Sequence, residues 1–245
     1  MGTEFIDAKA AEILALPRKT LIEDLIKVLD DSCARFNYFT AIGNYDEKTN
    51  SFPIHALWLL SELKAYEALP TALHLIRQPE YWMHYWFGDL LTEGLSDVFY
   101  RLGDNNLELL KDYAKEPDNY AFARAIAPNV VSMVAFYQPE RRQEALAWLS
   151  DVCQYMIDNH ELEGVSDYTF NSMLVHDVMD CKGEEFFNLL EEMYDMGIVD
   201  MSFNGDWEDT LSEYREYTQN RDTPSNPYRT MQEMYDWMKE MNSPV

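Results

Sequence analysis

The side chains best suited to chemistry lie together in one aromatic stretch of the sequence. His84 could act as a general acid or base. Asp89 and Glu93 are carboxylates four positions apart, which places them on one face of a helix. Tyr85 and Trp86 are of the residue types that most often anchor a bound peptide. The stretch therefore predicts a candidate partner-binding site made of His84, Tyr85, Trp86, Asp89 and Glu93.

Two interpretations of this stretch stay open. In one, the aromatic side chains line a groove that grips a peptide, and the two carboxylates bind a basic side chain. In the other, the aromatic side chains wedge between helical units and Asp89, after Gly88, caps the helix that follows. The alternative function is an enzyme of unrecognised type with a pocket near His84, Asp89 and Glu93, and the sequence does not decide whether the protein is an enzyme.

The remaining residues of chemical interest do not form a known motif. The five histidines are scattered and show no HxxxH or HExxH spacing: His55, His74, His84, His160 and His176. No acidic cluster has the spacing of a calcium loop. His176 and Asp180 share a helix face, but Cys181 lies on a different side, so a nucleophile and base pair is not expected. The sequence predicts no metal and no cofactor.

Charge and cysteine content limit the class of partner. The net charge of −25 repels nucleic-acid phosphates and anionic membranes, so neither is an expected partner. The three cysteines lack a CxxC pair, which favours free, mostly buried thiols in a reducing compartment. No apolar run is long enough to span a membrane, and the first residues lack a signal-peptide pattern. We therefore expect a cytoplasmic protein.

The elements that must position these residues are helices. Apolar residues recur at helical spacing, and glycine is sparse, with 9 residues. Two successive helix pairs match at an offset of 38 positions, as in Leu57 with Leu95, Leu60 with Val98, Leu69 with Leu107 and Pro79 with Pro117. A period near 40 made of two helices is typical of HEAT-like α-solenoids. The sequence predicts an all-α fold, a HEAT-like α-α superhelix of antiparallel helix pairs stacked as a short right-handed solenoid.

Local signals predict the helix boundaries and the domain organisation. Thr20 to Glu23 has the pattern of a capping box, and Pro128 predicts a kink inside a helix that includes Ala123 and Val134. We expect a HEAT-like repeat domain over residues 1–200. A C-terminal helical extension over 201–245, with a flexible linker near 219–226, should pack on the same domain.

The segment HALWLLSELKAYEALP from His55 to Pro70, followed by GDLLTE from Gly88 to Glu93, resembles the bacterial DUF1186 family. The resemblance covers roughly residues 20–200 and implies a helical, HEAT-like domain of uncharacterised function. Some members carry a C-terminal zinc-binding segment rich in cysteine and glycine. The sequence shows no such segment, so we expect no metal site by that route, and the family supplies no catalytic residues.

Together these observations predict a cytoplasmic protein-interaction module. Its acidic, aromatic-inlaid face would bind a basic or amphipathic segment of an unidentified protein partner. A third interpretation is a scaffold whose C-terminal helix makes a homodimer.

Overall fold

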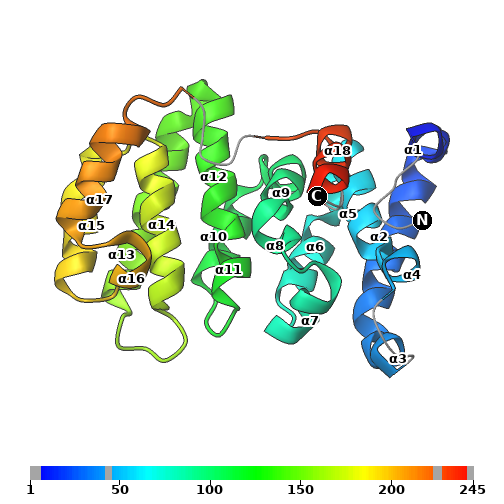
Figure 1. The fold of residues 1–245 in the computed structure, drawn as a ribbon, viewed down its shortest axis with the longest axis horizontal. Coiled ribbons are helices and arrows are strands. Elements are labelled where there is room, and N and C mark those ends of the chain that lie inside the picture. Colours follow the sequence, from blue (N-terminus) through cyan, green and yellow to red (C-terminus); the bar gives the residue numbers. More distant parts are fainter. Residues whose placement is uncertain (1–6, 42–45, 223–227, 242–245) are drawn as a thin grey trace. The chain divides into compact units, whose positions relative to one another are not determined.

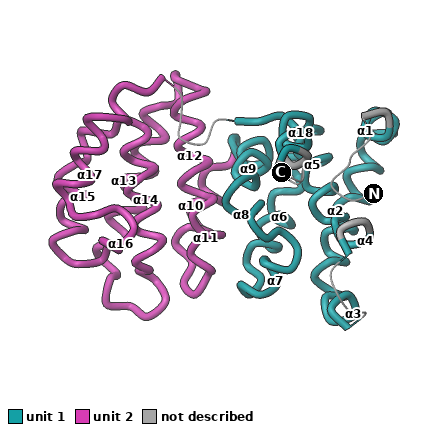
Figure 2. Tube along the Cα trace, in the orientation of Figure 1, with its two compact units in different colours: residues 1–105, 228–245 teal, residues 106–227 magenta. Residues whose placement is uncertain are grey.

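The protein is all-α in its computed structural model, which describes residues 7–41, 46–222 and 228–241. These residues hold helices and no strand (Figure 1). They form two compact units, unit 1 with residues 1–105 and 228–245, and unit 2 with residues 106–227 (Figure 2). The domain boundary predicted at residue 200 lies inside unit 2 and stays a prediction, as does the stacking of helix pairs into a solenoid. Part of the predicted linker, residues 223–226, lies outside the described residues.

Unit 1 contains most of the N-terminal helices and the last helix of the chain. In order they are α1 (Asp7–Leu14), α2 (Arg18–Ala34), α3 (Phe36–Ala41), α4 (Glu47–Asn50), α5 (Phe52–Glu62), the 3-10 turn η1 (Tyr66–Ala68), α6 (Leu69–Ile76), α7 (Glu80–Trp86), α8 (Leu90–Glu93), α9 (Leu95–Gly103) and α18 (Met231–Met241).

Unit 2 is built from the helices between them. In order they are α10 (Leu107–Lys115), α11 (Ala121–Arg124), α12 (Ile126–Tyr137), η2 (Pro139–Arg141), α13 (Arg142–Asp158), α14 (Tyr168–Asp180), η3 (Glu184–Phe186), α15 (Phe187–Asp195), α16 (Met201–Asn204), α17 (Trp207–Glu213) and the π-helical turn η4 (Tyr214–Thr218).

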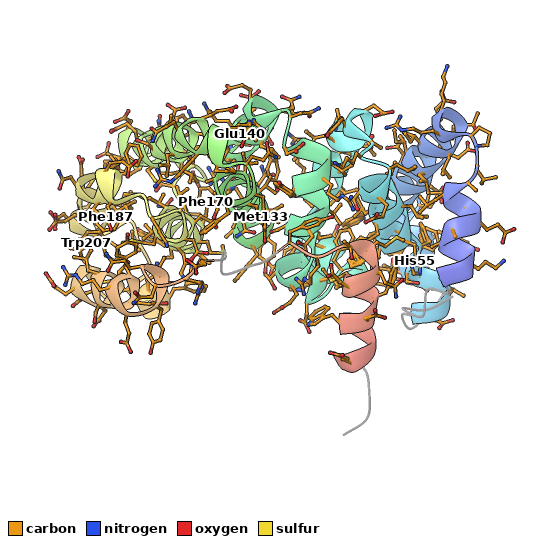
Figure 3. All side chains as sticks on the ribbon, turned by 90° about the horizontal axis from the view of Figure 1, so that it is seen from above. His55, Met133, Glu140, Phe170, Phe187 and Trp207 are labelled. Atoms are coloured by element: carbon orange, nitrogen blue, oxygen red, sulfur yellow. The ribbon has the colours of Figure 1, made fainter. Side chains whose placement is uncertain are left out.

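Helix α5 lies at the centre of unit 1. Every residue from Pro53 to Ser61 is buried, so the helix is covered on all sides rather than on one stripe. Helices α2, α9 and α18 pack against it. In unit 2, α12 is buried over most of its length and packs between α10, α13 and α14. Met133 and Phe170, from α12 and α14, lie in this core (Figure 3).

Two predicted helix features are wrong, and proline is the reason in both cases. Helix α2 begins at Arg18, directly after Pro17, and Thr20 lies within its first turn, where its hydroxyl donates to the carbonyl of Pro17 at 3.0 Å. Helix α11 ends before Ala125 and α12 begins after it. Pro128 therefore lies in the first turn of α12 and does not kink a longer helix. A proline is tolerated in the first turn because its missing N–H needs no partner there.

An arginine closes the C-terminal end of α5. Arg18, the first residue of α2, donates through Nη2 to the carbonyl oxygens of Leu63 at 3.2 Å and Lys64 at 3.3 Å. Lys64 has a φ of 46°, the left-handed conformation that ends many helices. The arginine therefore supplies a donor to carbonyl groups just beyond α5, and that of Lys64 also accepts from the N–H of Tyr66 at 3.0 Å.

Unit 2 repeats this arrangement. Arg142, the first residue of α13, donates through Nη2 to the carbonyl oxygens of Cys181 at 3.1 Å and Lys182 at 2.9 Å, just after α14. Lys182 has a φ of 54°. Helices α2 and α13 are both 17 residues long. The two units thus share one way of ending a helix against the start of an earlier one.

A fully buried arginine ties three segments of unit 2 together. Arg124 donates through Nε to the carbonyl of Ala114 and through Nη1 to the carbonyl of Val165, each at 2.6 Å. Its guanidinium lies 4.2 Å from the centre of the Phe170 ring. Burial lowers the pKa of Arg124 to about 10, so the side chain is still charged at neutral pH.

We expect Arg124→Met to lower the free energy of unfolding by about 2–4 kcal/mol, because two buried carbonyl groups lose their donors. Denaturant titration followed by circular dichroism measures this. Arg215→Met, at an exposed position, is the matched control and should change stability by no more than about 0.5 kcal/mol. A loss below about 1 kcal/mol for Arg124→Met would contradict the assigned role.

Candidate functional site

The aromatic stretch forms α7, and one side of this helix is core. Trp82 and Trp86, one turn apart, point inward together with Met83. Trp86 is 1% exposed, and its ring lies 5.3 Å from Phe39 and 5.1 Å from Phe52. The prediction that Trp86 contacts a partner is therefore wrong, because helical spacing places it among core aromatic rings.

The opposite side of α7 is open to solvent. Tyr81 is 64% exposed and His84 is also exposed. Tyr85 is half-buried and is fixed at its tip, where its hydroxyl accepts from Asn50 Nδ2 at 2.8 Å. The ring of Phe36, from α3, lies 5.7 Å from Tyr81 and 5.3 Å from Tyr85. We call Phe36, Tyr81, His84 and Tyr85 the α7 surface.

The predicted carboxylates lie at α8 and not on the helix of His84. Asp89 and Glu93 are exposed at the two ends of α8, whereas His84 Nε2 lies 3.3 Å from Glu80 Oε1 on α7. Asp89 occupies the predicted position directly before α8, but its side chain makes no capping hydrogen bond. A capping residue usually has extended backbone, whereas Asp89 is already helical.

A second candidate site in unit 1 is the groove that holds α18. Met234 and Tyr235 are each 1% exposed. The hydroxyl of Tyr235 hydrogen-bonds with Nδ1 of His55, on α5, at 2.5 Å, and its ring meets Trp58 edge-on at 5.1 Å. Figure 3 labels His55 on α5. The helix is therefore held by a polar contact and an aromatic contact to the central helix of the unit.

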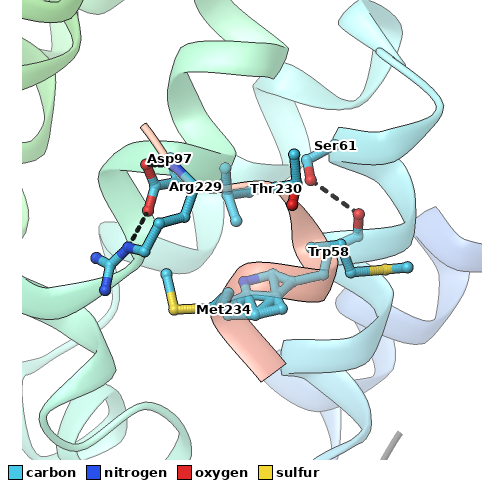
Figure 4. A pocket seen from close by; sticks show the side chains of 8 residues that line it. Trp58, Ser61, Asp97, Arg229, Thr230 and Met234 are labelled. Atoms are coloured by element: carbon cyan, nitrogen blue, oxygen red, sulfur yellow. Dashed lines mark hydrogen bonds and ion pairs between the residues drawn. The ribbon is translucent and has the colours of Figure 1, made fainter. Parts of the chain in front are cut away.

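Gly94 shapes the same groove for Met234. A Cβ atom at Gly94 would lie 2.7 Å from Cε of Met234 and 3.6 Å from the Trp58 ring. Figure 4 shows Met234 beside the indole of Trp58. The absence of a side chain at Gly94 thus makes the space that the methionine fills.

Buried and half-buried acids hold the start of α18. The main-chain N–H of Arg229 donates to Asp97 Oδ1 at 2.9 Å, and Nε lies 3.2 Å from Oδ2 (Figure 4). Arg229 also donates to the carbonyl of Glu93. Glu62 accepts from the N–H of Met231 at 3.1 Å and pairs with Arg101. Carboxylates at a helix N-terminus are favourable because the first N–H groups lack partners within the helix.

Sequence reasoning did not single out this groove. We define it by His55, Trp58, Glu62, Gly94 and Asp97. His55 stands inside the apolar run of α5, and Asp97 among the apolar residues of α9. Polar residues on such faces were a usable signal, since a buried polar group needs a partner. The partners lie 132 and 180 positions away, which no local pattern shows.

Unit 2 contains a hollow of about 220 Å³ lined by Arg142, Lys182, Arg221, Asp222, Cys181, Ala135 and Phe136. Its charges do not favour an anion, because Arg142 lies 3.8 Å from Glu185 and Arg221 lies 3.9 Å from Asp180. Burial raises the pKa of the Cys181 thiol to about 12. The thiol is therefore protonated at neutral pH, which does not suit a nucleophile.

Residues 7–41, 46–222 and 228–241 contain neither a candidate metal cluster nor a candidate membrane span. No group of three or more histidine, cysteine, aspartate or glutamate side chains there is placed to hold a metal ion. No helix within those ranges is both long and apolar enough to cross a membrane.

The fold and the two sites define an all-α protein with an exposed aromatic surface and a filled helix-binding groove in unit 1. A family model described as "Protein of unknown function (DUF1186)" matches residues 3–241. The chain belongs to this family, which confirms the resemblance seen in residues 55–70 and 88–93.

Comparison with known proteins adds one relative and no structure. An uncharacterized protein of Chlamydia trachomatis serovar D is 24% identical over 151 residues, which cover 61% of this chain and 57% of that protein. The match thus spans little more than half of the relative. No solved structure is significantly similar to the chain.

The raised pKa of Asp97 predicts how the stability of unit 1 depends on pH. Burial raises this pKa from 3.8 to about 6, against the opposing effect of Arg229. The folded state therefore favours the protonated carboxyl. The contribution of the Asp97 carboxyl to the unfolding free energy is complete below about pH 4 and is lost as the pH rises through about 6.

We expect the difference in unfolding free energy between the wild-type chain and Asp97→Asn to fall by about 2–3 kcal/mol from pH 4 to pH 8. Denaturant titration at several pH values measures this difference. Asp30→Asn, at an exposed position, serves as the control and should leave the profile of the wild-type chain unchanged. A difference that stays constant across this range would show that Asp97 does not titrate there.

Proposed function

We propose that the protein is a helical-repeat interaction module, with HEAT-like helix pairs stacked as a short right-handed solenoid. It acts in the cytoplasm and binds a basic or amphipathic segment of a protein partner. The α7 surface is the face that meets this segment. Asp89, just before α8, and Glu93, at its end, are exposed and extend the candidate contact set with negative charge.

The observation that carries this proposal is the exposure of Tyr81 above a fixed aromatic core. Interface anchors are most often tyrosine, tryptophan or arginine, and the exposed Tyr81 ring lies beside that of Phe36. Trp82 and Trp86 underneath are buried, and the hydroxyl of Tyr85 is held by Asn50. The surface is therefore held in place before a partner arrives, which reduces the entropy lost on binding.

Charge favours a basic segment over an acidic one. The chain has 44 acidic and 19 basic residues, so its field attracts a cationic partner. The groove around α18 has contacts of the same kind. There Asp97 pairs with Arg229, and the rings of Trp58 and Tyr235 are in contact.

The enzyme alternative rests on His84, Asp89 and Glu93. His84 lies on α7 and is paired with Glu80, whereas Asp89 directly precedes α8 and Glu93 ends it. This alternative stays a prediction from the sequence, and no described contact favours it.

We expect Tyr81→Ala to weaken binding of a fluorescein-labelled synthetic helix, with lysines on one face and leucines on the other, by at least about 10-fold. Alanine substitution of an anchoring aromatic residue typically has an effect of this size. Fluorescence anisotropy with the full chain measures the affinity.

Tyr217→Ala is the matched control, because Tyr217 is 55% exposed and lies in unit 2. It should leave the affinity unchanged, and added salt should weaken binding to both the wild-type chain and the control. Equal losses for Tyr81→Ala and Tyr217→Ala, or no binding by the wild-type chain, would contradict the proposal.

A further inference from the structure

The segment that holds α18 is attached to unit 2 but packs on unit 1. Helical turn η4 of unit 2 ends at Thr218, and residues 228–241 belong to unit 1 (Figure 2). The connection between them has the sequence QNRDTPSNP, which is polar and of linker composition. The groove therefore recognises a segment that reaches it from the far end of the chain.

Recognition of this segment depends on a few side chains with defined partners. Arg229 binds Asp97 and the carbonyl of Glu93. Met234 occupies the space above Gly94, and Tyr235 is bound by His55 and Trp58. Aromatic, methionine and arginine anchors of this kind are typical of an amphipathic helix bound in a groove.

Each of these contacts joins the groove to the segment, and none of them involves the linker. The contacts are therefore the same whether groove and segment belong to one chain or to two. An identical segment from another molecule would meet identical partners. Exchange of an identical element between copies is a route to dimers that needs no new contacts. Within one chain the tethered segment has a high effective concentration, which favours binding of the chain's own segment. Exchange is therefore favoured when protein concentration is high or when the contact within one chain is weakened.

We propose that the groove formed by His55, Trp58, Glu62, Gly94 and Asp97 also binds residues 228–241 of a second copy of this chain. Two copies then exchange their C-terminal helices and form a reciprocal dimer. The α7 surface takes no part in this contact.

Charge reversal in the full chain tests the exchange. Asp97→Arg places like charge opposite its own Arg229, and Arg229→Asp places like charge opposite its own Asp97. Each variant alone should be monomeric with a loosened C-terminal helix. In an equimolar mixture both grooves find a segment of opposite charge, so a dimer with one copy of each variant should form.

Sedimentation velocity and circular dichroism follow the two variants and their mixture. The double variant with both substitutions restores a pair of opposite charge within one chain and should resemble the wild-type chain. Tyr81→Ala, added to both partners, should leave the mixed dimer intact, which separates this proposal from the proposed function. A mixture that stays monomeric, with both variants folded, would overturn the exchange.

A second measurement keeps the test decisive if Asp97→Arg does not fold. A fluorescein-labelled peptide of residues 228–241 is added to the full-length Arg229→Asp chain and to the full-length wild-type chain. The peptide should bind the Arg229→Asp chain at least ten times more tightly, because the chain's own segment no longer competes. The same peptide carrying Tyr235→Ala and Met234→Ala should bind neither chain. Equal affinities for the two chains, or no binding to either, would overturn the proposal.

Discussion

Carbonyl groups at helix ends need donors, and in the described part of this protein four arginine side chains donate to main-chain carbonyls. Cations are scarce, with 19 lysines and arginines against 44 acidic residues. Even so, Arg18, Arg124, Arg142 and Arg229 each donate to at least one main-chain carbonyl. The ends of helices carry partial negative charge, so a guanidinium there is doubly favourable. Each of these arginines therefore joins its own segment to a main-chain carbonyl elsewhere in the same unit.

The candidate surfaces depend on elements fixed in this way. Arg18 holds the end of α5, and α5 presents His55 and Trp58 to the last helix. Arg229, two residues before that helix, binds the carbonyl of Glu93 at the end of α8 and Asp97 on α9. The α7 surface is supported differently, by two buried tryptophans beneath Tyr81. One surface is therefore positioned by charge and hydrogen bonds, and the other by aromatic packing.

Helical periodicity was enough to predict an all-α chain and to locate the aromatic helix α7. It could not tell which of the adjacent aromatics would be buried, since Trp86 and Tyr85 are consecutive and face different surroundings. Helical periodicity also could not predict the backbone conformation of Asp89. An aspartate after Gly88 can be either extended, as a capping residue usually is, or already helical, as it is here. The groove was missed because its polar pairs join residues far apart in the chain.

Packing of the last helix on the first unit has a consequence for synthesis on the ribosome. Residues 228–241 emerge after all of unit 2, so the groove on α5 is uncovered while the rest of the chain is made. During that interval the apolar face of Trp58 is open to water or to a chaperone. Contacts between residues 132 and 180 positions apart also form late, because their loop closure is entropically costly. Docking of α18 on α5 therefore follows the synthesis of unit 2.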